Sequence, residues 1–336
     1  MKVVTSLDGE IKIMDLPPPV IKDNHVIVKT EYSAVSPGTE LMLLRKKHQV
    51  PMPLGYSASG LVIETGRNVD HVRIGERVAC YGGPYVKHAE YLLVPKNLVV
   101  SVPDGVDMKE ASMIGLGAIA IHALRQAGLK FGESVVVVGL GILGQLIAQI
   151  AHCAAFKVIG YDLLEERCQK LKDCGIDAVG QTLEEVQELV NIKTQHMGVD
   201  SVLLCTNGNS EGLIDHALTW IRDRGNVVIV GDLKPVFSRT QMFRKEAEIL
   251  ISRAAGPGRY DPDYETKGFD YPPSFVRWSE GRNMQEYIRL LAEKRINVAS
   301  LVTHTVSINQ LSHIYRSLMD QPQNMLGVLI DFGLTH

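Results

Sequence analysis

The chain has 336 residues, which is long enough for two domains of ordinary size. Hydrophobic residues make up 45%, charged residues 22%, and the formal net charge is −3, a composition typical of globular proteins. Because no basic stripe is present that could follow a phosphate backbone, the sequence argues against nucleic-acid binding.

The first third of the chain, residues 1–115, is predicted to form a small β domain. Short runs of apolar and β-branched residues alternate with glycine and proline clusters, which favours antiparallel strands joined by turns. The strands are expected at 25–29, 60–64, 77–80 and 90–94, and the turns at 17–19, 36–38 and 82–84.

From residue 116 to 255 strands alternate with helices, which predicts an α/β domain with a doubly wound parallel sheet. Asp162 can cap a helix that stops at Gly175, and Thr182 forms a capping box with Glu185 at the start of the next helix. The strands are expected at 135–138, 158–161, 202–205, 227–230 and 249–251.

After residue 255 a polar, aromatic-rich segment is followed by two amphipathic helices and a final strand at 326–332. The helices carry apolar faces around Met284–Leu291 and Leu311–Leu318. We expect the final strand to return to the first domain, which would then be discontinuous (1–115 and 256–336).

Targeting features are not visible in the sequence. The apolar stretch 135–151 is shorter than the ~20 residues that a membrane span needs and contains three glycines, so a buried strand, turn and helix explain it better. The five cysteines are scattered without metal-site spacing, and the N-terminus lacks the pattern of a signal peptide. We therefore expect reduced thiols, no membrane association and a cytoplasmic location.

A glycine motif follows the predicted strand at 135–138 and opens an apolar helix. In this context the first glycine allows a tight turn, the second lets the backbone approach a pyrophosphate, and the third lets helix and strand pack closely. The helix N-terminus then offers free N–H groups to the phosphates. The residues are Gly139, Gly141, Ile142, Leu143 and Gly144.

Asp162 ends the next predicted strand, 18 residues after Gly144. A carboxylate there accepts hydrogen bonds from ribose hydroxyls and repels a 2′-phosphate, so we expect NAD rather than NADP as the cofactor. Asp162 could instead serve only as a helix cap, and Arg167 could reach the adenosine or remain a solvated helix charge.

Two further strand ends carry polar residues that could meet the ribose or the nicotinamide. They are Thr206 and Asn207 after one strand and Gly231 after the next. Ligands of open α/β sheets collect at the carboxyl ends of strands, although turn chemistry explains the same residues.

Together these features resemble the medium-chain dehydrogenase/reductase superfamily, in its zinc-type alcohol and threonine dehydrogenase-like branch. The resemblance implies a GroES-like, β-rich catalytic domain beside a Rossmann domain. Residues 256–268 and 271–284 are similar, more specifically, to the dehydrogenase half of bi-domain oxidoreductases. Besides the glycine motif and Asp162, the superfamily resemblance is carried by residues 32–41, 53–66, 72–79 and 88–106.

Set against zinc-containing members of the superfamily, the chain lacks the metal ligands. The cysteine position of their first motif holds Ser36 or Pro37, and Gly-His-Glu becomes Gly55-Tyr56-Ser57. No Cys or Glu lies near Gly115, and the four-cysteine lobe is absent. Since tetrahedral zinc needs three or four N, S or O ligands around one point, we expect no metal.

Protein hydroxyls would then replace the zinc in catalysis. The resemblance places Thr39 at a proton-relay position and Tyr56 at a former ligand position, so both are candidate catalytic residues, with Glu40 beside them. A loop role for Thr39, plain packing for Tyr56 and a buried ion pair for Glu40 are the alternatives. As a base near neutrality, Tyr56 would need a lowered pKa. Ser36 and His88 are candidate substrate contacts, although His88 could equally be a packing histidine.

Arginines in the segment after residue 255 suit polyols or anionic groups, so Arg259, Tyr260 and Arg277 are further substrate candidates. A loop pinned by ion pairs is the alternative. We also expect a homodimer or homotetramer, since the resemblance implies that the last strand of the nucleotide domain, here near Glu248–Ser252, pairs with its mate across a two-fold axis, and its apolar edge would otherwise be exposed.

Three functions remain open on the sequence. The first is a zinc-independent NAD(H) oxidoreductase that interconverts a secondary alcohol and a ketone on a small-molecule sugar, cyclitol or sugar acid. The second is a zinc-free reductase of quinones or enones. The third is a non-catalytic NAD(H) sensor. Asp162 and the polar segment favour the first.

Overall fold

The computed structural model describes residues 1–208, 212–321, 323 and 325–333. The chain divides into two units, each considered by itself below. Unit 1 comprises Met1–Ala118, Ala255–Lys294 and Val298–His336, and unit 2 comprises Ile119–Ala254 and Arg295–Asn297. The expected boundaries, after residues 115 and 255, fall close to these.

The short segment 295–297, expected in the first domain, belongs to unit 2 because it is tied to α4 (Ile142–Cys153). The side chain of Gln149 accepts a hydrogen bond from the N–H of Asn297 at 2.8 Å, and Arg295 donates to the carbonyl of Cys153 at 3.1 Å. These bonds join residues nearly 150 positions apart, so no local sequence pattern could have predicted them.

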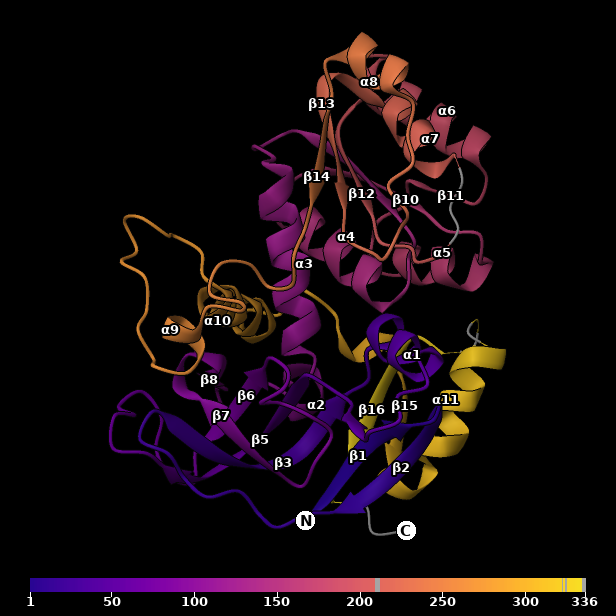
Figure 1. Ribbon diagram of the computed structural model, residues 1–336. Helices are drawn as coiled ribbons and strands as arrows, with labels where there is room; N and C mark the ends of the chain where they lie inside the picture. Colours follow the sequence, from indigo (N-terminus) through magenta and orange to yellow (C-terminus); the bar gives the residue numbers. More distant parts are fainter. Residues whose placement is uncertain (209–211, 322, 324, 334–336) are drawn as a thin grey trace. The chain divides into compact units, whose positions relative to one another are not determined.

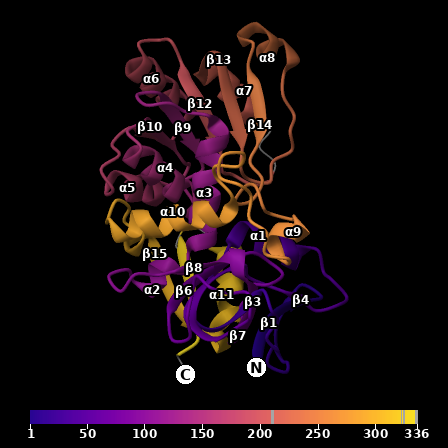
Figure 2. The same ribbon diagram turned by 90° about the vertical axis from the view of Figure 1, so that its left-hand side faces the viewer.

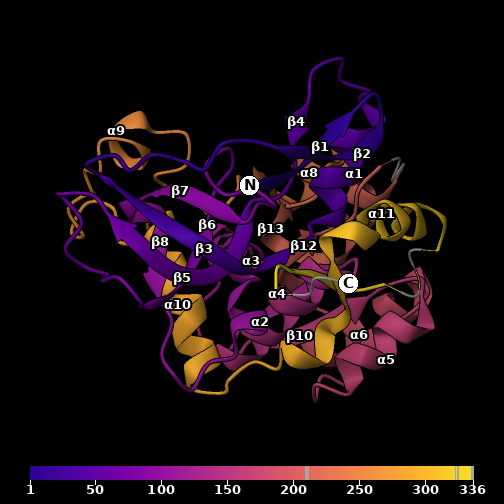
Figure 3. The ribbon, with the colours of Figure 1, turned by 90° about the horizontal axis from the view of Figure 1, so that it is seen from below.

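Unit 1 is built mainly on antiparallel strands (Figures 1 and 3). The strands are β1 Lys2–Leu7, β2 Glu10–Asp15, β3 His25–Ala34, β4 Met52–Pro53, β5 Ser57–Thr65, β6 Arg77–Tyr81, β7 Tyr91–Pro95, β8 Val99–Ser101, β15 Val302–Ser307 and β16 Gly327–Asp331. The helices are α1 Pro37–Arg45, α2 Met108–Ala111, α9 Pro262–Glu265, α10 Glu280–Ala292 and α11 Leu311–Asp320, with 3-10 turns at Lys96–Leu98, Ala299–Leu301 and Ile308–Gln310.

The large sheet of unit 1 has the order β15-β16-β3-β5-β6-β8, and β7 also pairs with β3. The final strand β16 pairs antiparallel with β3, so the C-terminal segment returns to the first domain as expected. A second sheet has the order β2-β1-β4. Only the β15–β16 pair of the large sheet is parallel.

Unit 2 is a parallel sheet covered by helices on both faces (Figures 1 and 2). The strands are β9 Ser134–Val138, β10 Lys157–Tyr161, β11 Val179–Gly180, β12 Val199–Leu204, β13 Ile221–Ile229 and β14 Glu248–Ile251. Besides α4, the helices are α5 Glu165–Lys172, α6 Leu183–Thr194, α7 Leu213–Trp220 and α8 Arg239–Lys245; α3 (Ile114–Ala127) begins in unit 1.

The strand order of this sheet, β11-β10-β9-β12-β13-β14, is the 3-2-1-4-5-6 order of a doubly wound fold. Val136 and Val138 of β9 face the core formed with α6 and α7, whereas a Cβ at Gly160 of β10 would meet Leu171 of α5. The sheet is therefore buried on both faces, which explains the continuous valine run of β9.

Helix starts in unit 2 follow the expected chemistry at one position and depart from it at another. Thr182 and Glu185 form the capping box at the start of α6, as expected. The Asp162 cap is wrong, because α5 begins at Glu165 with Leu164 as its N-cap. The carboxylate of Asp162 instead accepts hydrogen bonds from the N–H groups of Leu140 and Leu164.

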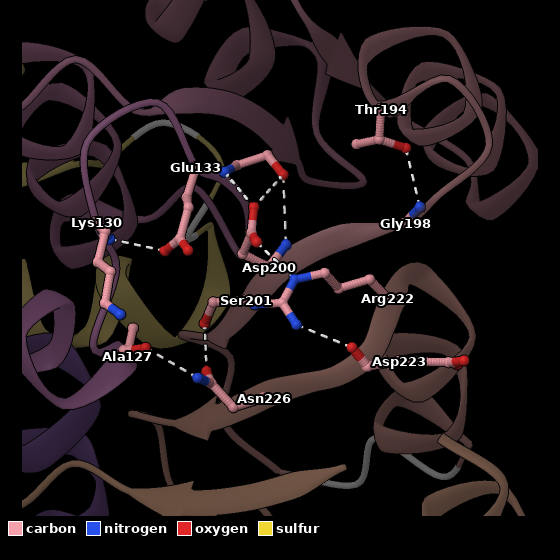
Figure 4. Close-up of polar contacts among 11 residues, drawn as sticks. Ala127, Lys130, Glu133, Thr194, Gly198, Asp200, Ser201, Arg222, Asp223 and Asn226 are labelled. Carbon is pink, nitrogen blue, oxygen red and sulfur yellow. Dashed lines mark hydrogen bonds and ion pairs between the residues drawn. The ribbon is translucent and has the colours of Figure 1, made fainter. Parts of the chain in front are cut away.

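A polar network ties together the amino-terminal ends of the parallel strands (Figure 4). One oxygen of Asp200 accepts hydrogen bonds from the N–H and the hydroxyl of Ser134, at 2.7 and 2.9 Å, and the other accepts from Arg222 at 2.7 Å. The hydroxyl of Ser201 donates to Asn226, which in turn donates to the carbonyl of Ala127. This network lies opposite the carboxyl ends, where ligands collect, and its role is structural.

Among the described residues, no helix is long and apolar enough to cross a membrane. The apolar stretch at 135–151 is instead β9, the glycine turn and most of α4.

Candidate functional site

The glycine motif of unit 2 forms an open turn between β9 and α4. Gly139 has a φ of +87°, a conformation that other residues rarely adopt. A Cβ at Gly144 would lie 1.9 Å from the carbonyl oxygen of Gly139, so helix and turn are in direct contact there. A Cβ at Gly141 would meet nothing within 4 Å. The turn is therefore closed on its protein side and open at Gly141.

The N-terminus of α4 has the donors that a phosphate needs. Gly141 is the N-cap and provides no side-chain cap, so the N–H groups at Ile142 and Leu143 are not bound by a capping side chain. Backbone donors and the positive end of the helix dipole favour an anion at this point.

Asp162 connects the glycine turn to the end of β10. Its carboxylate is 7% exposed and accepts the N–H of Leu140 at 2.7 Å and that of Leu164 at 3.0 Å. The guanidinium of Arg167 lies 3.5 Å from the same carboxylate. Arg167 is therefore anchored beside Asp162 rather than being a solvated helix charge, and both residues stand next to the turn.

Gln145 is a positioning residue that the sequence reasoning missed. Its buried amide donates to the carbonyls of Leu140 and Arg167, at 3.2 and 2.8 Å, and so joins the glycine turn to α5. The signal that could have revealed it is a polar residue inside an otherwise apolar helix.

The three residues at the ends of β12 and β13 divide into two groups. The Asn207 side chain accepts the N–H of Asp232 at 2.7 Å, and a Cβ at Gly231 would lie 1.9 Å from the carbonyl of Thr206. These two residues are engaged in turn chemistry, the alternative explanation. Thr206 differs, because its hydroxyl is buried without a hydrogen-bond partner among the described residues. The open Gly141, the uncapped α4 and this orphaned hydroxyl fit a dinucleotide.

In unit 1 the candidate catalytic residues gather around the start of α1. Ser36 is the N-cap of the helix, Pro37 is suited to its first position, and one helical turn brings Glu40 back over Ser36. The N–H of Ser36 donates to Oε1 of Glu40 at 2.7 Å. The phenol of Tyr56 donates to Oγ of Ser36 at 2.6 Å. Thr39 is exposed on the same turn.

The phenol of Tyr56 is held in its protonated form. Burial, the largest cause, raises the pKa of Tyr56 to about 12, and the negative charge of Glu40 raises it further. The hydrogen bonds with Ser36 and Thr39 lower the pKa but do not outweigh burial. A base near neutral pH would need a lowered pKa, so the buried phenol does not meet that condition. Tyr56 is instead suited to donate a hydrogen bond or a proton. Its ring also packs edge-on against Tyr81, with centroids 5.8 Å apart.

Glu40 and His88 form a buried pair behind Tyr56. Oε2 of Glu40 lies 3.0 Å from Nε2 of His88, and the side chains are 1% and 0% exposed. Helix α11 packs against α1 (Figure 3). Its Tyr315 also donates to Oε2 of Glu40. Both side chains are enclosed by protein and cannot touch a substrate. The expectation that His88 contacts the substrate is therefore wrong, and so is a direct catalytic contact by Glu40.

The positions of the family's zinc ligands do not fit a metal. Ser36 and Tyr56 are hydrogen-bonded to each other, and the oxygens of Glu40 are already occupied by Ser36, His88 and Tyr315. No group of three or more His, Cys, Asp or Glu side chains in the described part of the chain is placed to hold a metal ion. Neutral hydroxyls and a carboxylate with its acceptors engaged are poor zinc ligands.

Arg259 acts as a brace rather than a free substrate ligand. Its guanidinium is ion-paired with buried Glu265 and donates to the carbonyl of Gly83. These contacts agree with the alternative stated above, in which the arginine holds a loop in place. A Cβ at Gly83 would lie 3.9 Å from Cβ of Tyr56, so the brace supports the segment beside Tyr56. Tyr260 is exposed and lies under the Arg259 guanidinium, and exposed Arg277 stacks on Trp278.

Glu280, at the start of α10, is a second residue that the sequence did not reveal. Both carboxylate oxygens are buried without a hydrogen-bond partner among the described residues. Burial raises the pKa of Glu280 to about 8; Arg259 opposes this shift and Glu265 adds to it. No periodicity or motif distinguishes this glutamate from an ordinary one in a first helical turn.

Comparison with known proteins places this geometry in a family. The family model described as alcohol dehydrogenase GroES-like domain matches residues 22–104, and the model described as zinc-binding dehydrogenase matches residues 143–266. Sorbitol dehydrogenase from Halalkalibacterium halodurans is 25% identical over 345 residues, which cover 92% of this chain and 93% of that protein.

Two further relatives agree. D-guloside 3-dehydrogenase from Shigella flexneri is 27% identical over 286 residues, which cover 83% of this chain and 77% of that protein. The crystal structure of galactitol-1-phosphate dehydrogenase from Escherichia coli has a TM-score of 0.81 at 20% identity, and covers 98% of this chain and 100% of that chain. The expected fold, a GroES-like domain with a Rossmann domain, is thereby confirmed. The similarity to bi-domain oxidoreductases stays a prediction.

The chain belongs to the zinc-type alcohol dehydrogenase-like, medium-chain dehydrogenase/reductase superfamily and is an enzyme of the dehydrogenase type.

Proposed function

We propose that this enzyme is a zinc-independent, NAD(H)-dependent oxidoreductase that interconverts a secondary alcohol and a ketone on a polar substrate such as a sugar, cyclitol or sugar acid. The observation that carries the proposal is the 2.6 Å hydrogen bond between Tyr56 and Ser36, two hydroxyls at positions of zinc ligands. The names of the sorbitol and D-guloside dehydrogenases support the substrate class.

Asp162 supports NAD over NADP. Its carboxylate is fixed beside the glycine turn by two backbone N–H groups, which leaves lone pairs for ribose hydroxyls. A 2′-phosphate at the same place would meet a negative charge. The neighbouring guanidinium of Arg167 is already directed to Asp162 and does not cancel this preference.

The proposed chemistry leaves one proton for the protein to handle. Bound NAD⁺ would accept a hydride from the carbinol carbon, in the reaction R₂CHOH + NAD⁺ → R₂C=O + NADH + H⁺. Exposed Thr39 is the hydroxyl that can meet the substrate oxygen, and its hydrogen bond with Tyr56 connects it to Ser36. In the reverse direction the protonated Tyr56 stabilises negative charge that develops on the ketone oxygen.

The test is nicotinamide absorbance with EDTA-treated enzyme. NAD⁺ is offered with polyols, cyclitols and sugar acids, and NADH with quinones and enones. We expect turnover of a hydroxylated substrate that survives the chelator, and a Tyr56→Phe variant slower by about 10²–10⁴-fold, the usual contribution of a positioned proton donor. Zinc-dependent turnover contradicts zinc independence. Turnover only with quinones or enones contradicts the reaction class, and tight NADH binding without any turnover favours a sensor.

A further inference from the structure

We infer that Arg259 is a positioning residue for the reaction: through the turn Gly82–Gly83 it fixes the backbone of Tyr56 and, with it, the place of the Tyr56 phenol. Its effect on turnover rests on the proposed function. Its effect on the backbone at Gly82 can be measured in the enzyme without any substrate.

The guanidinium of Arg259 joins two segments of unit 1 that lie 176 residues apart in the sequence. Nη1 is ion-paired with Glu265, and Nη2 donates to the carbonyl of Gly83 at 2.5 Å. The side chains of Arg259 and Glu265 are only 9% and 7% exposed, so water and salt weaken these bonds little. One guanidinium can bind the carboxylate and the carbonyl at once because its N–H groups form a rigid fork.

The loop that carries Arg259 is itself held in place. Gly258 has a φ of +104°, and a Cβ there would lie 2.8 Å from the ring of Tyr264, so a larger residue does not fit. The carbonyl of Tyr264 in turn accepts a hydrogen bond from the side chain of Asn97 at 2.8 Å. Arg259 therefore reaches Gly83 from a fixed base.

The turn Gly82–Gly83 passes this constraint on to Tyr56. The N–H of Gly82 donates to the carbonyl of Tyr56 at 2.8 Å, and a Cβ at Gly83 would lie 3.9 Å from Cβ of Tyr56. Tyr56 immediately precedes β5, whose pairing with β6 begins at Ser57. The bond from Gly82 extends this pairing by one residue and holds the backbone of Tyr56 against the turn.

Two successive glycines make this turn depend on an outside partner. Gly82 has a φ of +112°, and glycine has more backbone freedom than any other residue. The bond from Arg259 to the Gly83 carbonyl restricts that freedom. Its loss should let the turn open more often and move Tyr56, whose phenol donates to Ser36 at 2.6 Å.

Catalysis should respond to such a movement because Tyr56 acts by its position. In the proposed reaction its phenol stabilises negative charge that develops on the ketone oxygen, and this depends on donor geometry. A misplacement of about 1 Å can lower a rate by about 10²-fold. Because Arg259 acts through Tyr56 and not on the substrate, its loss should lower kcat and leave KM nearly unchanged.

The first experiment is amide hydrogen exchange of the Gly82 N–H, followed by NMR in the enzyme without substrate. Arg259→Lys keeps the positive charge, but a single ammonium should stay with Glu265 and leave the Gly83 carbonyl without its charged donor. We expect the Gly82 N–H to exchange at least about tenfold faster in this variant. Unchanged exchange overturns the inference.

Arg282→Lys is the matched control. The side chain of Arg282 is 13% exposed and also bridges a carboxylate and a backbone carbonyl, with Asp270 at 2.5 Å and the carbonyl of Tyr271 at 2.7 Å. These partners lie in another part of the chain than the Gly82 turn, so exchange at Gly82 should stay at the wild-type rate. Equally fast exchange at Gly82 in both variants shows general loosening and overturns the inference.

The Tyr56 phenol provides a spectroscopic signature. In enzyme labelled with ¹³Cζ-tyrosine, the NMR signal that disappears in Tyr56→Phe belongs to Tyr56. We expect this signal to shift in Arg259→Lys and to stay in place in Arg282→Lys, and a signal that does not move in Arg259→Lys overturns the positioning of the phenol. If Arg259→Lys does not fold, Glu265→Gln, which keeps the shape of the side chain and removes the charge that orients Arg259, decides by the same measurements.

The alcohol-oxidation assay separates the two proposals. We expect kcat to fall about 10–10²-fold in Arg259→Lys at nearly constant KM, and to stay near the wild-type value in Arg282→Lys. A rise in KM alone would show that Arg259 binds the substrate and would overturn the inference. Faster Gly82 exchange and a shifted Tyr56 signal in an enzyme without turnover support the positioning and contradict the proposed function. Turnover with an unchanged kcat in Arg259→Lys supports the function and overturns the positioning role.

Discussion

Two glycines of the dinucleotide motif should respond in opposite ways to the same added methyl group. A Cβ at Gly144 would lie 1.9 Å from the carbonyl oxygen of Gly139 and 2.9 Å from its carbon. Carbon and oxygen approach only to about 3.3 Å even in the closest common contacts, so α4 would have to move by more than an ångström. We expect Gly144→Ala to lower the free energy of unfolding by about 1–3 kcal/mol or more, the cost of overpacking.

Gly141 has room for the same methyl group, and its φ of −64° and ψ of −176° suit alanine. We expect Gly141→Ala to change the free energy of unfolding by about 0.5 kcal/mol at most, or to raise it slightly by restricting the unfolded chain. The methyl group would occupy the approach of the pyrophosphate, so NADH affinity should fall by at least about tenfold, or 1.4 kcal/mol.

Urea unfolding followed by circular dichroism, together with NADH fluorescence titration, measures both quantities on each variant. A Gly144→Ala variant as stable as the wild type would contradict the first expectation, because the contact with Gly139 would then be relieved at no cost. A Gly141→Ala variant that binds NADH with wild-type affinity would contradict the second, since the open side of the turn would then not be the phosphate site.

Three further outcomes follow. Asp162→Ala should reduce the preference for NAD over NADP by about tenfold or more in kcat/KM; an unchanged ratio would remove Asp162 from the cofactor site. Asp200→Asn should cost about 1.5–3 kcal/mol at pH 7 in urea unfolding. Burial raises the pKa of Asp200, but hydrogen bonds from Arg222 and Ser134 lower it below 3.8 overall. The stability that the ionised carboxylate contributes is therefore present above pH 3.8 and is lost as the pH falls through the folded pKa. The difference in unfolding free energy between wild type and variant should vanish below the folded pKa, and a difference that stays constant with pH would contradict this. Ile251 is 61% exposed on β14, the edge strand of the unit 2 sheet in Figure 2, and we propose that this edge pairs with a second copy. Ile251→Lys should therefore shift a dimer or tetramer toward monomer in light scattering, whereas a monomeric wild type would sink this proposal.

The dinucleotide half of the enzyme could be predicted from the sequence because its determinants are local. Four valines, a glycine turn and a helix lie within 20 residues, and Asp162 follows one strand later. The strands β9, β10, β12 and β14 were expected close to their observed positions, whereas β13 begins at Ile221, six residues before the expected start at 227. The Asp162 cap failed because α5 begins only at Glu165, and one oxygen of the Asp162 carboxylate bonds the N–H of Leu140, 22 residues away.

The catalytic half was predicted only as a set of candidates. Ser36, Thr39 and Glu40 stand together in the sequence, and Tyr56 was drawn to them by resemblance alone. The meeting of Glu40 with Tyr315 joins residues 275 positions apart, and that of Ser33 with His88 spans 55. No periodicity or motif specifies such pairs.

By itself the sequence determined the fold class and the glycine turn, because these depend on the spacing of apolar residues and glycines along the chain; the family came from a resemblance of motifs that the comparisons bear out. Only the tertiary structure decided which polar groups are buried and which of them meet. It placed Glu40 and His88 in an enclosed pair, tied Arg259 to Glu265 and Gly83, and fixed the Tyr56 phenol as a hydrogen-bond donor to Ser36. The physical reason is that desolvation, hydrogen-bond satisfaction and pKa depend on neighbours in space, which distant segments supply only when the chain has folded.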